Sequence, residues 1–159
     1  MALWKPPSTL GLSEIIGRRI FDKSVRQVDE QDRPLFEVND FYEKREGADI
    51  SVDRLGVSPT KQTKSAITGL ADSEATQRQP KLLFLGWASI RIKDLKFPHW
   101  EPKILASPTA DEEGKPGNIW HAEISQDGFR ERAQTYTLAT ALLQTFQRKG
   151  YFEQPQRNA

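Results

Sequence analysis

The sharpest chemical pattern in this sequence is His-Ala-Glu at positions 121–123, within the stretch 118–125. Successive side chains of an extended strand point to opposite faces, so His121 and Glu123 would share one face. Imidazole is the usual general base near neutral pH, and a neighbouring carboxylate can orient it or help to bind a metal ion. This pair is therefore the first candidate for catalysis, although the same residues also suit an ordinary polar strand face.

A second stretch, 49–55, alternates in the same way and places Asp49, Ser51 and Asp53 on one face. Followed by Arg54, these residues could bind a metal ion or a phosphate. Alternatively, they are the solvated side of a strand, with Arg54 paired to Asp53. If the two stretches are neighbours in one sheet, His121, Glu123 and Asp53 would converge as a base with two supporting carboxylates, and Arg54 would complete the candidate site. The identity of any metal stays open.

The composition excludes several chemistries. With no cysteine there is no disulfide, no thiolate nucleophile and no iron–sulfur cluster, and two histidines are too few for a three-histidine zinc site. The chain also lacks a glycine-rich phosphate loop, a Gly-x-Ser-x-Gly elbow and a dinucleotide fingerprint. We therefore expect no cofactor.

Length and charge indicate one globular domain. A chain of 159 residues with eight Phe, four Trp and three Tyr can bury a substantial core. A formal net charge of +1 disfavours nucleic-acid binding without excluding it. The first residues show no signal-peptide pattern, and the longest apolar run, 82–88, is too short to span a membrane. We therefore expect a soluble, cytoplasmic protein with no membrane association.

Hydrophobic periodicity predicts a single α+β domain over 12–152, preceded by an extended arm (1–11) and followed by a flexible tail (153–159). The expected sheet is mixed but mostly antiparallel, with strands near 49–55, 81–92, 102–106 and 118–125. The run 81–92 is apolar on both faces, which is typical of a central strand, and Gly86 within it indicates a bulge or a close backbone approach.

The clearest helix is expected at 130–149, packed on one face of the sheet and ended by Gly150. Its apolar face would comprise Tyr136, Ala139, Leu142, Leu143 and Phe146. A weaker helix follows Ser58, its expected cap, and runs toward Arg78. The segment 12–21 is expected to be a short helix or turn leading into a strand, the alternative being a first strand through 18–21.

Two further clusters have ordinary structural interpretations. The basic residues Arg18, Arg19, Lys23 and Arg26 are countered by nearby acidic residues and are expected to form a solvated face. The aromatic side chains of Trp87, Phe97 and Trp100 could stack on nucleic-acid bases, but core packing is favoured because the surrounding charge is mixed. His99 is expected to be a turn residue.

The strand Ser51-Val52-Asp53-Arg54, followed after a long gap by Asn118-x-x-His121-Ala122-Glu123-Ile124, resembles a pattern in small bacterial proteins without assigned function. This resemblance implies a bacterial or phage-related origin and transfers no catalytic role.

Two functional hypotheses follow. The first is an accessory or interaction protein whose aromatic-rich surface docks a protein partner. The second is a small enzyme that acts on a nucleotide or phosphodiester, with His121 as general base and Glu123 and Asp53 as supporting carboxylates. The absence of catalytic motifs favours the first, and the sequence leaves the oligomeric state open.

Overall fold

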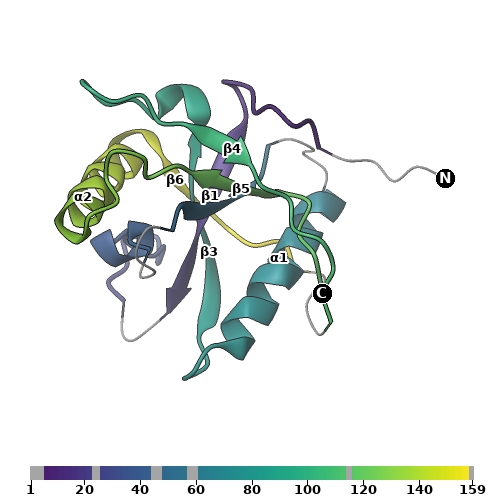
Figure 1. Ribbon diagram of the computed structural model, residues 1–159. Coiled ribbons are helices and arrows are strands. Elements are labelled where there is room, and N and C mark those ends of the chain that lie inside the picture. The colour runs from purple at the N-terminus through teal and green to yellow at the C-terminus, as the bar shows by residue number, and fades with distance from the viewer. Residues whose placement is uncertain (1–5, 23–25, 44–47, 57–60, 114–115, 158–159) are drawn as a thin grey trace.

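The computed structural model describes residues 6–22, 26–43, 48–56, 61–113 and 116–157. These residues form one sheet with the strand order β4-β5-β2-β1-β3-β6, in which every pairing is antiparallel (Figure 1). The strands are β1 (Ile15–Asp22), β2 (Ile50–Arg54), β3 (Leu83–Arg91), β4 (Ile104–Ala106), β5 (His121–Ile124) and β6 (Tyr151–Glu153). The expected α+β fold is confirmed.

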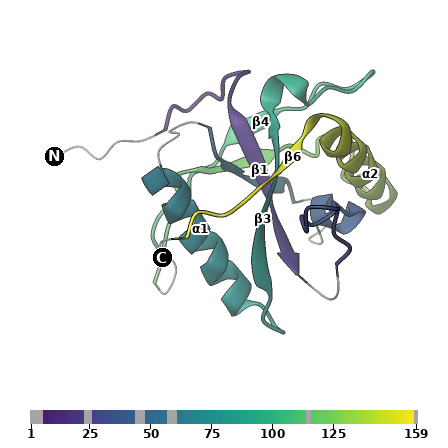
Figure 2. The same cartoon turned by 180° about the vertical axis from the view of Figure 1, so that it is seen from behind.

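Two α-helices, α1 (Lys61–Gln77) and α2 (Arg132–Lys149), lie on opposite sides of this sheet (Figures 1 and 2). A short 3-10 helix, η1 (Val38–Phe41), packs beside α2, and a second, η2 (Ile92–Asp94), follows β3. The cap expected at Ser58 lies outside the described residues. The helix that it was expected to begin is present, and Ile67, Ala71 and Ala75 form its buried stripe.

The sheet separates two apolar cores because alternate side chains point to opposite faces. The larger core lies between the sheet and α2 and contains Ile16, Ile20, Ile50, Val52, Ala88, Ile90, Ala122, Ile124, Leu138, Ala139, Leu142 and Phe146. The smaller core lies under α1 and contains Ile67, Ala71, Ala75, Phe84 and Trp87.

A bulge in β3 lets Phe84 and Trp87 share the α1 face. The pairing with β1 shifts between Ile20, opposite Gly86, and Phe21, opposite Phe84. The extra residue changes the alternation, so two positions separated by an odd number of residues face the same side. Gly86 has a φ of 144°, and a Cβ there would lie 2.5 Å from the Glu153 carbonyl oxygen. The expected bulge and close backbone approach are both confirmed.

The prediction that 81–92 forms the central strand is wrong in position. β3 is covered on both faces, as its composition indicated, but β1 and β2 occupy the middle of the sheet and only β6 lies outside β3. A turn at 12–13 leads into β1 at Ile15, so the expected turn before a strand is confirmed, and the short helix considered for this segment does not form. The hydrophobic pattern of a strand indicates whether both of its faces are buried, but it does not give the position of the strand in the sheet.

The helix at 130–149 is confirmed as α2, with one error in its apolar face. Tyr136 is 56% exposed, whereas Thr135, Leu138 and Thr145 are buried with the expected Ala139, Leu142 and Phe146. The buried stripe is displaced by about one position and is completed by threonines. Thr135 and Thr145 satisfy their hydroxyls by donating to backbone carbonyls of the same helix.

The residues that follow Phe152 also contact the rest of the chain. β6 continues to Glu153 and pairs with β3. Beyond it, the Gln156 backbone N–H donates to Thr68 Oγ1, and Arg157 pairs with Asp72 and donates to the Phe84 carbonyl. The chain therefore crosses the sheet edge and lies against α1 (Figure 2).

Candidate functional site

The sheet register brings the two predicted polar stretches together. Asp53 of β2 lies directly opposite His121 of β5, and Ser51 lies opposite Glu123. Directly opposed residues in an antiparallel pair point to the same face. Asp53, His121 and Glu123 therefore share the α1 side of the sheet, whereas Arg54 points to the other side.

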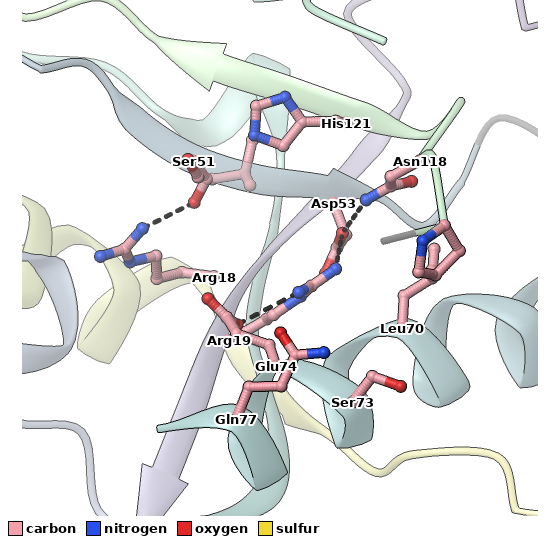
Figure 3. Close-up of a pocket in the computed structure, with 12 residues that line it drawn as sticks. Arg18, Arg19, Ser51, Asp53, Leu70, Ser73, Glu74, Gln77, Asn118 and His121 are labelled. Carbon is pink, nitrogen blue, oxygen red and sulfur yellow. Dashed lines mark hydrogen bonds and ion pairs between the residues drawn. The ribbon is translucent and has the colours of Figure 1, made fainter. Parts of the chain in front are cut away.

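Asp53 is a buried structural carboxylate, although it was expected on the wet side of a strand. Its side chain is 2% exposed. Arg19 binds it through Nε and Nη2 at 2.7 and 2.9 Å, and Trp87 Nε1 donates to it at 2.8 Å. Asn118 Nδ2 donates at 3.3 Å (Figure 3). Four N–H donors thus occupy the carboxylate oxygens, which leaves little capacity for a metal ion.

Arg19 is the principal counter-charge of this site. Burial disfavours its charged form, but the ion pair and hydrogen bonds with Asp53, together with Glu74, more than offset that effect and raise the pKa of the guanidinium. Its remaining nitrogen, Nη1, lies 3.2 Å from Glu74 Oε2. The Glu74 side chain is 38% exposed and also pairs with Arg78 through its other oxygen.

His121 is held by the backbone, not by Asp53. Its Nδ1 lies 2.7 Å from the Ser107 carbonyl oxygen, which can only accept, so Nδ1 carries the proton. In the neutral ring Nε2 is then an acceptor. Glu123 is half-buried two positions further along β5. Although strand alternation over 118–125 would place Trp120 on the same face as Ala122 and Ile124, Trp120 lies in the turn before β5 and packs on the α1 core.

Arg54 is not part of this site. It is 1% exposed and binds Glu14 through Nε and Nη2 at 2.6 and 3.2 Å, while Nη1 donates to the Pro7 carbonyl at 2.6 Å. The pairing of Arg54 with Asp53 considered from the sequence does not occur. Arg54 instead attaches the segment before β1 to the end of β2.

A polar cleft of about 300 Å³ opens on the α1 side of these residues (Figure 3). It forms where β1 and β2 diverge, because the two strands pair only at Ile16–Arg54 and Gly17–Asp53. Its lining comprises residues of β1, β2, α1, β5 and the segment before β5, namely Arg18, Arg19, Ser51, Val52, Asp53, Leu70, Ser73, Glu74, Gln77, Pro116, Asn118 and His121.

The arginines of β1 are the site residues that the sequence interpretation missed. Arg18, Arg19 and Arg26 were expected to form a solvated face, but they are partly buried and bonded to other elements, and Lys23 lies outside the described residues. Arg26 binds Asp40 of η1 through two nitrogens. A signal was present, because two consecutive arginines inside an apolar strand leave it from opposite faces, so at least one of them starts on a covered side. Arg18 starts on the same face as Ile16 and Ile20, and it reaches the cleft in the gap between β1 and β2.

The geometry does not assemble the metal site considered from the sequence. Among the described residues, no three His, Asp or Glu side chains gather as a metal ion would require. Asp53 already accepts four hydrogen bonds. The catalytic roles of His121, Glu123, Asp53 and Arg54 stay predictions, and the contacts of Asp53 and Arg54 argue that these two act structurally.

A second concavity, the aromatic groove, has a volume of about 400 Å³ and lies at the β4 edge of the molecule. Its lining is mainly apolar and comprises Leu12, Ile92, Lys93, Leu95, Lys96, Phe97, Pro98, Trp100, Glu101, Pro102 and Ile104. Trp100 lies between the rings of Phe97 and Phe129, each with a centroid separation of 5.1 Å. Of the aromatics considered for base stacking, Trp87 is fully buried and only Phe97 and Trp100 reach this groove.

Comparison with known protein families, with curated proteins and with solved structures finds no match to this chain. The resemblance to small bacterial proteins therefore stays a prediction. Among the described residues, no helix has the length and apolar character needed to cross a membrane.

Proposed function

We propose that this chain is a docking module that binds an extended, acidic segment of a protein partner in the aromatic groove. The single observation that carries the proposal is the position of this groove beside β4, the edge strand of the sheet that the described residues form. Ile104 belongs both to the groove lining and to β4, which is the outermost strand on that side. An added strand could therefore pair with β4 while its side chains enter the groove.

The backbone of β4 is oriented for such pairing. Ser107 donates its N–H to His121, and Lys103 accepts from Ser125, so the alternate residues 103, 105 and 107 face β5. The backbone groups of Ile104 and Ala106 consequently point away from β5. No backbone hydrogen bond joins them to another of the described residues outside the sheet.

The charge around the groove indicates the chemistry of the partner. Lys93 and Lys96 line the groove and are exposed, with Glu101 as the exposed acidic residue of the lining. Lys103, just before β4, is also exposed. Apolar anchors would enter between Leu12 and Trp100, and carboxylates on the same segment would meet the lysines.

Selection from a random peptide library displayed on phage tests this proposal. Enriched peptides should combine large apolar residues with Asp or Glu. Their affinity should fall about tenfold for a Lys93→Glu/Lys96→Glu double variant, equivalent to roughly 1.4 kcal/mol of lost attraction. Leu12→Ser should also weaken binding without loss of stability, because Leu12 is 72% exposed.

Lys81→Glu is the matched control, since Lys81 is exposed and precedes the opposite end of β3. Peptides that bind the wild type and all the groove variants equally would contradict the proposal. A chain that sediments as a dimer, and as a monomer when Leu12→Ser is introduced, would assign the groove to a second copy instead.

The enzyme hypothesis has one supporting observation. The Ser107 carbonyl fixes the His121 tautomer so that Nε2 is the acceptor, and His121 is one of the residues that line the polar cleft. Under this alternative proposal, the chain would hydrolyse a model phosphodiester and His121→Gln would abolish that activity. Absence of hydrolysis by the wild type, or full activity of His121→Gln, would contradict the enzyme proposal.

A further inference from the structure

Arg18 is a partly buried cation without a carboxylate in contact. Its Nε donates to the Asp40 carbonyl at 2.7 Å and its Nη1 to the Ser51 carbonyl at 2.8 Å, both neutral backbone groups. No carboxylate of the described residues forms an ion pair with it, although Arg19, Arg26 and Arg54 each have one. Burial lowers the pKa of Arg18, and more distant acidic residues compensate only partly.

This arrangement leaves the deep part of the polar cleft with more positive than negative groups. Arg18 and Arg19 both line the cleft, whereas Asp53 is the one fully buried carboxylate among its lining residues. Buried charges are normally paired, so an unpaired guanidinium beside a cleft is an exception that calls for a counter-ion. Glu74 supplies negative charge only at the rim.

Glu74 is placed so that another anion can replace it beside Arg19. One of its oxygens lies 3.2 Å from Arg19 Nη1 and the other lies 3.2 Å from Arg78 Nη2. If the first contact opens, Glu74 keeps Arg78 as a partner one helical turn away. Arg19 would keep its two bonds to Asp53 and present Nη1 to the cleft.

We propose that the polar cleft binds the phosphate or carboxylate group of a small molecule, which takes the place of Glu74 beside Arg19 and supplies the missing counter-charge for Arg18. Guanidinium groups suit both kinds of oxyanion. The hydroxyls of Ser51 and Ser73 and the amide of Gln77 lie on the same lining and offer further donors. A volume of about 300 Å³ leaves room for a small organic body attached to the anion.

Nuclear magnetic resonance titration with inorganic phosphate and, separately, with acetate tests this proposal against sodium chloride at matched ionic strength. The Trp87 indole N–H is the natural reporter because it donates to Asp53 beside Arg19. We expect saturable shifts of this signal and of the Arg18 and Arg19 Nε–H signals. Saturation with phosphate alone or with acetate alone would identify the preferred oxyanion, whereas changes that merely follow ionic strength would overturn the proposal.

Three variants sharpen this experiment. Glu74→Gln removes the competing carboxylate and should tighten anion binding about threefold. Glu112→Gln makes the same charge change at an exposed position outside the cleft lining and should leave affinity unchanged. Equal tightening in both variants, or none in Glu74→Gln, would contradict the proposal. If Arg18→Gln folds, it should weaken anion binding about tenfold. If it does not fold, the comparison of Glu74→Gln with Glu112→Gln tests the proposal.

Discussion

Asp53 shows how far a single residue can depart from its sequence pattern. Its position on a polar strand face favoured a solvated or catalytic carboxylate, but the structure surrounds it with Arg19, Trp87 and Asn118. Burying a charge is tolerated only when it is paired and hydrogen-bonded, as it is here. Asp53 therefore holds β1, β2, β3 and the turn before β5 together.

Asp53→Asn should lower the free energy of unfolding by about 3–5 kcal/mol, because it leaves the Arg19 cation without its buried partner. Urea denaturation followed by circular dichroism measures this loss. Asp72→Asn is the control, since Asp72 and Arg157 are both exposed and their ion pair should contribute at most about 1 kcal/mol. Similar small effects of both substitutions would show that Asp53 is not a structural centre.

Arg54 and Glu14 should behave as a coupled pair. Arg54→Met leaves the Glu14 carboxylate buried without its cation and should cost about 3–5 kcal/mol of stability. Adding Glu14→Gln removes that uncompensated charge, so the double variant should recover part of the loss. A double-mutant cycle measured by denaturation gives the coupling, and strictly additive losses would count against the pair.

At the scale of elements, β3 depends on the unusual backbone conformation of Gly86, whereas replacing Gly69 should stabilise α1. Gly86→Ala places a methyl group 2.5 Å from the Glu153 carbonyl at a φ of 144° and should destabilise the chain by about 1–3 kcal/mol or more. Gly69→Ala meets nothing within 4 Å on α1 and should stabilise it by roughly 0.5–1 kcal/mol.

Thermal denaturation of both glycine variants tests this contrast. Hydrogen exchange in β6 adds a local readout, because the clash at Gly86 is with β6 and should raise exchange there. Unchanged melting of Gly86→Ala would mean that β3 can relax at the bulge. A destabilised Gly69→Ala would contradict the open surroundings of Gly69.

Local patterns predicted most of the elements, but not how they are combined. Alternation identified β2, and the helical period with Gly150 identified α2, because both depend on neighbours in the sequence. The partners of Asp53 come from positions 19, 87 and 118, and no local pattern links them. Tyr136 was misplaced because an aromatic ring beside an apolar stripe fits either face until the packing partners are known.

At the scale of the whole molecule, the two concavities lie in different parts of the fold. The aromatic groove belongs to the β4 edge and the segment after β3, whereas the polar cleft lies between α1 and the middle of the sheet. Neither lining shares a residue with the other. A partner in the groove and a small anion in the cleft would therefore not compete for the same side chains.

This separation predicts that the groove and cleft variants act independently. Lys93→Glu/Lys96→Glu should leave the phosphate affinity, followed by the Trp87 indole signal, within about twofold of the wild-type value, since neither lysine lines the cleft and salt screens exposed charges. Glu74→Gln should likewise leave peptide affinity unchanged. Loss of both kinds of binding in either variant would indicate one shared site.

Amide hydrogen exchange of the chain with and without a selected acidic peptide tests the docking proposal most directly. Strand addition predicts slower exchange at Ile104 and Ala106, whose N–H groups point away from β5, with no change at the opposite sheet edge in β6. Protection confined to β6 or to the polar cleft, with β4 unchanged, would contradict the account.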